Sequence, residues 1–252
     1  MATFCLIHGA WHEPSCWDPL LPHLERHGHE AVAPELPLHD PGAGFKERIR
    51  PAHEALAGID GQIVIVGHSQ GTAYSSLVAA ERPASLLVHL CPRLGGFEEP
   101  PNAPGPFREG VPFPATSADG TSAWDPDMAI SAMYRRLSPE AAQTLAQRLR
   151  PMAMPAEEYP LTEHPDVATA LIYAADDELF DPDWQRFMAL ELLGIEPIEV
   201  PTGHFPMVED PGGLADLLNR LAREHPSGDR FSSGCRSPRR AAPDRAARSP
   251  PR

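Results

Sequence analysis

The sequence predicts an α/β fold: a doubly wound, mostly parallel six-stranded sheet with an inserted helical cap. Two observations predict it. Short apolar runs without polar alternation, typical of strands buried on both faces, are separated by longer amphipathic stretches. Alternating strands and helices connect through right-handed crossovers, which make the strands parallel and cover both faces with helices. The 252 residues, 42% of them hydrophobic, suffice for one sizeable core.

The expected strands are continuous apolar runs that end in glycine, proline or polar residues. They cover residues 3–9, 30–36, 62–69, 85–92, 169–176 and 196–203. The expected helices are amphipathic stretches at about 16–27, 45–57, 71–82, 183–193 and 211–224. A helix therefore follows every strand except the fourth.

After the fourth strand, about 70 residues interrupt the alternation. The first part is rich in proline and glycine, whereas residues 125–150 suit two helices. Asp125 and Ser138 are expected to be their N-caps, because a proline follows each at the first helical position. A structureless loop of this length is rare in a compact domain. We therefore expect a helical cap at 95–164, between core segments 1–94 and 165–225.

Charge and cysteine usage restrict the class of protein. The net charge is −14, but residues 226–252 contain seven arginines and two acids, so this tail carries +5 and the remainder −19. An acidic body disfavours nucleic-acid binding, and the Pro/Ser/Arg-rich tail is expected to be disordered. No apolar stretch approaches the ~20 residues of a membrane span, and the N-terminus lacks a secretory pattern. The four cysteines form no CxxC pair, and Cys5 and Cys91 are expected to be buried thiols. We expect a cytoplasmic protein with neither a membrane nor a nucleic-acid partner.

The strongest chemical motif is Gly67-His68-Ser69-Gln70-Gly71, at the end of a strand and the start of a helix. G-x-S-x-G in this context is a nucleophile elbow. The turn is so tight that its flanking positions need residues almost without side chains, and the serine projects above the sheet beside a helix N-terminus. The motif predicts that Ser69 is a nucleophile.

A serine nucleophile needs a base and a site for the oxyanion. His204 is the base candidate, because it follows the last strand and so lies at the same sheet edge as Ser69. The backbone N–H groups of Gln70 and Ala10 are the expected oxyanion donors. His8 and His68, in strand-end turns, are expected to have structural roles.

Four acids, Asp176, Asp177, Glu178 and Asp181, follow the fifth strand. Asp181 precedes a proline and is expected to cap a helix, and Glu178 is expected to be a solvated loop residue. Consecutive side chains leaving a strand point in opposite directions, so only one of the two aspartates can face His204. The residues alone leave that choice open. No histidine or cysteine accompanies these acids at ligand spacing, so we expect no metal site.

The motifs HGAWH, GHSQG and GHFPMVEDP, in this strand order, resemble the α/β-hydrolase superfamily. The stretch LIHGAWHEPSCWDPLLPHLERHGHEAVAPEL is similar to the small esterase branch that includes plant methylesterases and hydroxynitrile lyases. The resemblance covers about residues 3–224 and implies a Ser-His-Asp triad without a cofactor. Its acid frame, G/A-x-x-D, corresponds to Ala174–Asp177 and selects Asp177. The lyases have a threonine where this chain has Gly9, and a cap lysine that is absent here, since Lys46 is the only lysine. Cyanohydrin cleavage is therefore disfavoured.

These observations together predict a carboxylesterase for small, neutral, partly aromatic esters. The expected pocket residues are apolar or aromatic side chains near the oxyanion loop, in the cap and beside the base: Trp11, His12, Trp124 and Phe205. Three alternatives remain: a cofactor-free lyase, oxygenase or cyclase on the same fold, a non-catalytic ligand-binding relative, and a metal-dependent enzyme that uses the acids at 176–181.

Overall fold

The computed structural model describes residues 1–94 and 103–226. Its centre is a six-stranded sheet with the order β2-β1-β3-β4-β7-β8 and parallel pairing throughout. The strands are β1 (Thr3–Ile7), β2 (Glu30–Val32), β3 (Ile63–His68), β4 (Leu86–Leu90), β7 (Thr169–Ala174) and β8 (Ile198–Val200). The predicted fold class and strand number are confirmed.

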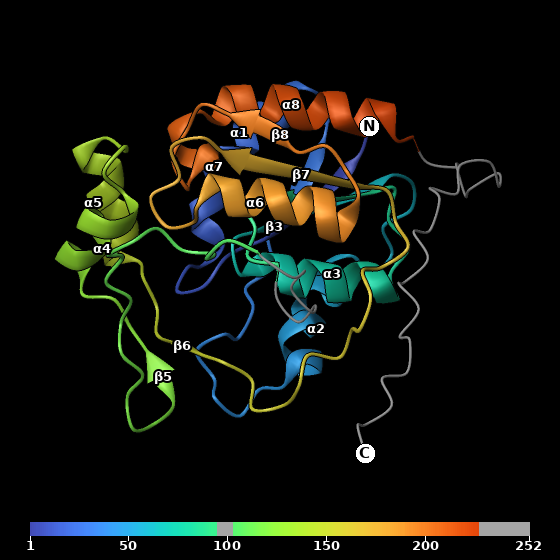
Figure 1. Ribbon diagram of the computed structural model, residues 1–252. Helices are drawn as coiled ribbons and strands as arrows, with labels where there is room; N and C mark the ends of the chain where they lie inside the picture. Colours follow the sequence, from blue (N-terminus) through green and yellow to red (C-terminus); the bar gives the residue numbers. More distant parts are fainter. Residues whose placement is uncertain (95–102, 227–252) are drawn as a thin grey trace, which may run out of the picture.

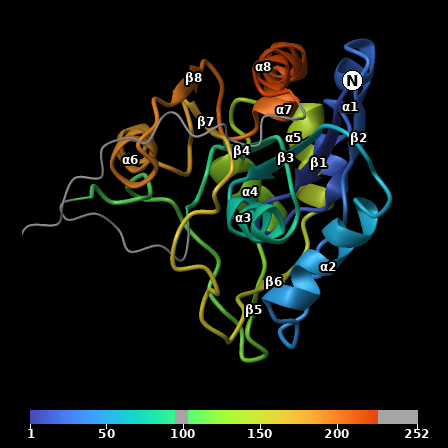
Figure 2. The same ribbon diagram turned by 90° about the vertical axis from the view of Figure 1, so that its right-hand side faces the viewer.

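Helices cover both faces of this sheet. Figures 1 and 2 show α1 (Leu21–Arg26) and α8 (Pro211–Glu224) over one face. The other face carries α2 (Phe45–Ala55), α3 (Gly71–Glu81) and α6 (Pro182–Met188). The central strands β1, β3 and β4 are buried along their whole length. Burial on both faces explains why their sequences are continuously apolar.

Several predicted elements differ from the structure. The stretch 16–27 is not one helix but a short 3-10 helix (Pro14–Trp17) followed by α1. Pro19 and Pro22 have no N–H to donate, so a continuous helix would lack bonds there. The outer strands are only three residues long and are not buried on both faces, because β2 and β8 form the edges of the sheet.

The insertion, defined here as residues 103–168, leaves the sheet between β4 and β7. It contains α4 (Pro126–Met133), α5 (Pro139–Gln147) and an antiparallel pair, β5 (Thr121–Ser122) with β6 (Met152–Ala153). Asp125 and Ser138 accept hydrogen bonds from the first turns of α4 and α5, so both predicted N-caps are confirmed. In Figure 1 the arrow of β7 points toward α4 and α5. The two helices therefore lie at the carboxyl end of the sheet.

The strand order places a topological switch point at this end. From β1 the chain crosses to β2 on one side, and then returns to β3 on the other. Crossovers that leave in opposite directions open a crevice at the carboxyl ends of the two strands, where α/β proteins bind ligands. The loops after β1 and β3 contain Ala10 and Ser69.

The remaining predictions concern cysteines, membrane spans and the tail. Cys5, Cys16 and Cys91 are buried free thiols, as predicted for Cys5 and Cys91. Within the described residues, no helix is long and apolar enough to cross a bilayer. The expectation for the arginine-rich tail falls on residues 227–252, outside the described ones.

Candidate active site

Ser69 follows β3 in a left-handed backbone conformation, with φ +52°. This region costs a non-glycine residue energy unless the surroundings enforce it. The Ser69 N–H donates to the Leu90 carbonyl at 3.0 Å. The Ser69 carbonyl accepts from the Thr72 hydroxyl at 2.7 Å and from the Arg93 N–H at 3.1 Å. The bonds to the strand end and to the helix start hold the serine in the turn predicted for a nucleophile elbow.

The two glycines of the motif allow close packing around the elbow. A Cβ on Gly71 would lie 2.5 Å from the His8 carbonyl oxygen, at the end of β1. A Cβ on Gly67 would collide with the Ser75 side chain of α3 and lie 2.8 Å from the Gly71 carbonyl oxygen. A side chain at either position would therefore push the elbow away from β1 or from α3.

Two backbone donors beside the elbow lack acceptors. Among the described residues, the N–H groups of Ala10 and Gln70 have no hydrogen-bond partner, although both residues are only 8% exposed. The loop after β1 contacts the elbow directly, since a Cβ on Gly9 would lie 3.1 Å from Ser69 Cβ. Buried N–H groups are rarely left unpaired in folded proteins. This pair is available for an oxygen that carries negative charge.

His204 and Asp177 form a buried pair at the same end of the sheet. His204 Nδ1 donates to Asp177 Oδ2 at 2.8 Å, and both residues are 1% exposed. Asp177 Oδ1 accepts from the N–H groups of Leu179 and Phe180, at 2.8 and 2.9 Å. Gln185 Nε2 donates to Oδ2 at 3.3 Å. Because Asp177 accepts a hydrogen bond from Nδ1–H, Nε2 is left as the nitrogen with a free lone pair.

The neighbouring acid has a different environment. Asp176 Oδ2 forms an ion pair with Arg136 at 3.1 Å, and its side chain is 55% exposed. The two consecutive aspartates thus diverge as expected of side chains that leave a strand. Asp181 caps α6 by accepting from the Asp183 N–H, which confirms its predicted role.

Glu178 was predicted to be a solvated loop residue, and the structure shows that this was wrong. It is 7% exposed, and its Oε2 accepts from the His204 N–H at 3.2 Å. Burial raises the pKa of its carboxyl group. The loop sequence around Glu178 could not reveal this, because its partner lies 26 positions away on a different strand end.

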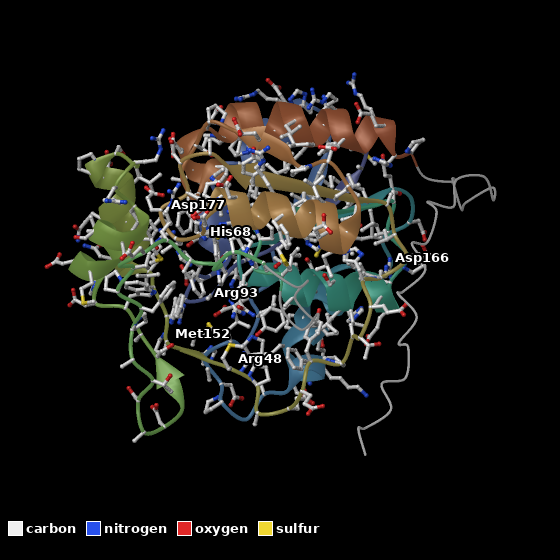
Figure 3. All side chains as sticks on the ribbon, viewed as in Figure 1. Arg48, His68, Arg93, Met152, Asp166 and Asp177 are labelled. Carbon is white, nitrogen blue, oxygen red and sulfur yellow. The ribbon has the colours of Figure 1, made fainter. Side chains whose placement is uncertain are left out.

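His68 and His8 have structural hydrogen bonds. His68 Nε2 donates to the His204 carbonyl at 2.8 Å, and the two rings lie 4.7 Å apart. Figure 3 shows His68 and Asp177 at the same end of the sheet. His8 Nε2 accepts from the Leu36 N–H at 3.1 Å. Burial lowers the pKa of both imidazoles, so both stay neutral at pH 7.

The four expected pocket residues form two aromatic pairs. His12 packs against Phe205 with ring centroids 4.9 Å apart, and Trp11 against Trp124 at 5.8 Å. The His12 imidazole bridges the loop after β1 and the insertion: Nδ1 donates to the Ala10 carbonyl and Nε2 accepts from the Tyr134 hydroxyl, both at 2.6 Å. These contacts border the loop that carries the Ala10 donor.

One group of side chains offers metal-ligand atoms close together. A sulfur of Cys91, a carboxylate oxygen of Asp177 and a ring nitrogen of His204 lie within 4.8 Å of one another. The last two already bond to each other, and burial raises the pKa of the Cys91 thiol far above its ordinary value. Within the described residues, the acids Asp176, Glu178 and Asp181 do not gather into such a group.

Comparison with known families agrees with this geometry. Residues 6–217 match the Alpha/beta hydrolase family. The chain belongs to this family. The predicted superfamily is thereby confirmed over most of the chain.

Two relatives and one solved structure show what this hydrolase is similar to. A "Pyrethroid hydrolase" of Sphingobium wenxiniae is 28% identical, over 86% of both chains. A "Norfluorocurarine synthase 1" of Strychnos nux-vomica is 25% identical, over 87% of this chain and 94% of the relative. The crystal structure of the methylesterase MES16 from Arabidopsis has a TM-score of 0.70 at 20% identity, over 88% of this chain and 98% of that chain. At that identity the last likeness concerns the fold.

Proposed function

We propose that this alpha/beta hydrolase is a carboxylesterase with Ser69 as nucleophile, His204 as base and Asp177 as the acid that orients it. The observation behind the proposal is the buried His204–Asp177 hydrogen bond of 2.8 Å, at the sheet edge where Ser69 is held in a strained turn. The unpartnered N–H groups of Ala10 and Gln70 complete the set of parts that acyl transfer requires.

The proposed reaction proceeds through an acyl-enzyme. Ser69 Oγ attacks the ester carbonyl carbon while His204 Nε2 takes the hydroxyl proton, and the N–H groups of Ala10 and Gln70 bind the resulting oxyanion. The carbon–oxygen bond to the alcohol then breaks, and Nε2 returns the proton to the departing oxygen. Water, deprotonated by His204, releases the acid and restores Ser69. Asp177 holds the tautomer and stabilises the imidazolium. This scheme needs no cofactor or metal.

The proposed substrates are small, neutral, partly apolar or aromatic esters. Aromatic side chains border the oxyanion loop, with Phe113 and Trp124 at 6.5 and 5.8 Å from Trp11. Such walls favour apolar groups over phosphates or free acids. The 28% identical relative that is named for pyrethroid hydrolysis is consistent with this class. Buried free thiols suit a reducing compartment, which supports a cytoplasmic enzyme. The acidic body of the chain is the reason to propose no nucleic-acid partner, and we propose no membrane partner.

A second candidate is non-hydrolytic chemistry on the same site, by a cofactor-free lyase, oxygenase or cyclase of a biosynthetic pathway. The relative named "Norfluorocurarine synthase 1" favours this alternative, since its name denotes a synthase. In that case the His204–Asp177 pair would act as a base without acylation of Ser69.

A panel of esters with varied acyl and alcohol parts, assayed with wild type and Ser69→Ala, tests the proposal. We expect the variant to lose at least about a thousandfold in turnover. A fluorophosphonate probe should label wild type, and the label should map to Ser69 by mass spectrometry. Ester turnover that survives in Ser69→Ala would refute the acyl-enzyme. Absence of both turnover and label in a folded wild type would favour the alternative or a non-catalytic relative.

A further inference from the structure

The loop that carries His204 is held by two glutamates. The Gly203 N–H donates to Glu209 Oε2 at 2.7 Å, and the His204 N–H donates to Glu178 Oε2 at 3.2 Å. Hydrogen bonds to charged acceptors are shorter and stronger than those between neutral groups. The two carboxylates therefore fix the backbone from which the His204 imidazole projects.

A cation from the insertion connects one of these acids, Glu209, to the end of a sheet strand. Arg136 follows the end of α4, and its Nε and Nη2 both contact Glu209 Oε1, at 2.9 and 2.8 Å. Its Nη1 lies 3.1 Å from Oδ2 of Asp176, the residue that precedes Asp177 in the sequence. Arg136 thus joins the end of β7 to Glu209 in α7 (Pro206–Glu209).

The stem of Arg136 also packs against the histidine loop. A Cβ on Gly203 would lie 2.9 Å from Arg136 Cδ and 2.6 Å from Glu178 Oε2, so only glycine leaves room for both side chains. The Glu209 side chain is 16% exposed and that of Arg136 39% exposed, which places the pair partly out of water.

The positive charge of Arg136 also has an electrostatic role. Asp176, Asp177, Glu178 and Glu209 surround one loop, and like charges so close repel one another. The hydrogen bond to Glu209 raises the pKa of Arg136, and the charges of Glu209, Asp176 and Glu178 add to that effect. Glu178 Oε1 has no partner among the described residues. A guanidinium at this place offsets that repulsion.

We propose that Arg136 is a positioning residue for His204. It acts through Glu209 on the Gly203 N–H, so that the position of the insertion sets the position of the base. The inference rests on the proposed function for its kinetic consequence, but not for its structural one.

The kinetic test uses Arg136→Met, which keeps the stem and removes the charge. We expect kcat to fall about tenfold or more with KM changed less than about twofold, because a misplaced base slows chemistry and not binding. Arg136→Lys, which retains the charge, should recover part of that loss. The matched control is Arg135→Met, since Arg135 is the exposed neighbour and has no hydrogen bond or ion pair within the described part of the chain. A loss confined to KM, a lysine variant as slow as methionine, or an equal loss in Arg135→Met would overturn the proposal.

A double-mutant cycle tests the route. If Arg136 acts through Glu209, the Arg136→Met/Glu209→Ala variant should be no slower than Glu209→Ala alone. Glu209→Ala already removes the carboxylate that Arg136 positions, so loss of Arg136 has no further effect. Additive losses would contradict this route.

Amide hydrogen exchange separates the inference from the proposed function. Exchange of the Gly203 and His204 N–H groups should be about tenfold faster in Arg136→Met than in wild type and unchanged in Arg135→Met, even if no ester is ever hydrolysed. Unchanged exchange in Arg136→Met would overturn the proposal whatever the kinetics show. Wild type without Ser69 labelling but with the expected exchange pattern would leave the positioning role standing and refute the esterase.

Discussion

Asp176 and Asp177 show how one position along the chain separates two roles. The Asp177 carboxylate is buried and accepts from His204, Gln185 and two backbone N–H groups. Asp176 is more than half exposed and faces Arg136. The difference is one of surroundings, because the chemistry of the two side chains is the same.

Asp177→Asn should lose about four orders of magnitude in kcat. An amide oxygen still accepts from the backbone N–H groups of Leu179 and Phe180, so the fold is kept. An amide NH2 facing His204 favours the wrong tautomer, with the proton on Nε2. Asp176→Asn is the matched control, and we expect a loss of less than about tenfold. Steady-state kinetics on one ester checks both, and the reverse ranking would shift the catalytic acid by one residue.

Local sequence patterns were informative for residues that depend on local structure. Strand–turn–helix contexts predict Ser69 and His204 as candidate site residues, and a following proline predicts the caps Asp125, Ser138 and Asp181. The choice of Asp177 needed a family frame. The contacts of Glu178, Gln185 and Arg136 were missed, because each joins segments distant in sequence and no local pattern encodes such a partner.

At the scale of elements, a buried arginine of α2, Arg48, connects this helix to the insertion. Figure 3 labels Arg48 beside Met152. Its guanidinium is 0% exposed and donates to the carbonyls of Ala43, Ala153 and Asp40, at 2.9, 2.7 and 3.0 Å. It also donates to the Tyr74 hydroxyl of α3. These bonds connect α2 to its preceding loop, to β6 and to α3.

Arg48→Met should lower the free energy of unfolding by about 3 kcal/mol or more, because it leaves several buried carbonyls without donors. Arg50→Met, on the same helix, removes only an exposed pair with Glu54 at 3.6 Å and should change stability by less than about 0.5 kcal/mol. Urea unfolding followed by circular dichroism measures both. Equal effects would mean that the Arg48 contacts contribute nothing specific.

Element type was predicted better than element length. The central strands are buried on both faces, and their sequences are therefore continuous apolar runs that predict strands clearly. At the edges, β2 and β8 stop early, because each has one neighbouring strand in place of two. The β5–β6 pair has two residues per strand, too few for any periodic signal.

At the scale of the whole molecule, four of the buried imidazoles among the described residues have lowered pKa values: His8, His12, His68 and His89. Burial lowers all four pKa values, to about 4 for His12 and to about 3 for His89. The unfolded chain binds these protons near pH 6.5, whereas the folded chain does not until the pH is much lower. Stability should therefore be lost as the pH falls from about 6.5 toward 4. Glu178, whose pKa is raised, opposes this trend.

The lowered pKa of His12 alone reduces the free energy of unfolding by about 3 kcal/mol at pH 4, relative to neutral pH. His12→Gln should reduce the loss of unfolding free energy between pH 7 and 4 by that order. The exposed His39, replaced by glutamine, is the control and should leave the pH dependence unchanged. Denaturant unfolding at several pH values gives the comparison. A His12→Gln profile parallel to wild type would show that this imidazole is protonated without difficulty in the fold.

The parts of the candidate site come from four strand ends, at Ala10, Ser69, Asp177 and His204. The proposed nucleophile and oxyanion donors belong to the first third of the chain, and the proposed base and its acid to the last third. During synthesis Ser69 therefore leaves the ribosome long before His204, its proposed base, has been made. A nascent or truncated chain that ends before β8 contains the G-x-S-x-G motif but not its proposed base, so on the proposed mechanism it should be inactive.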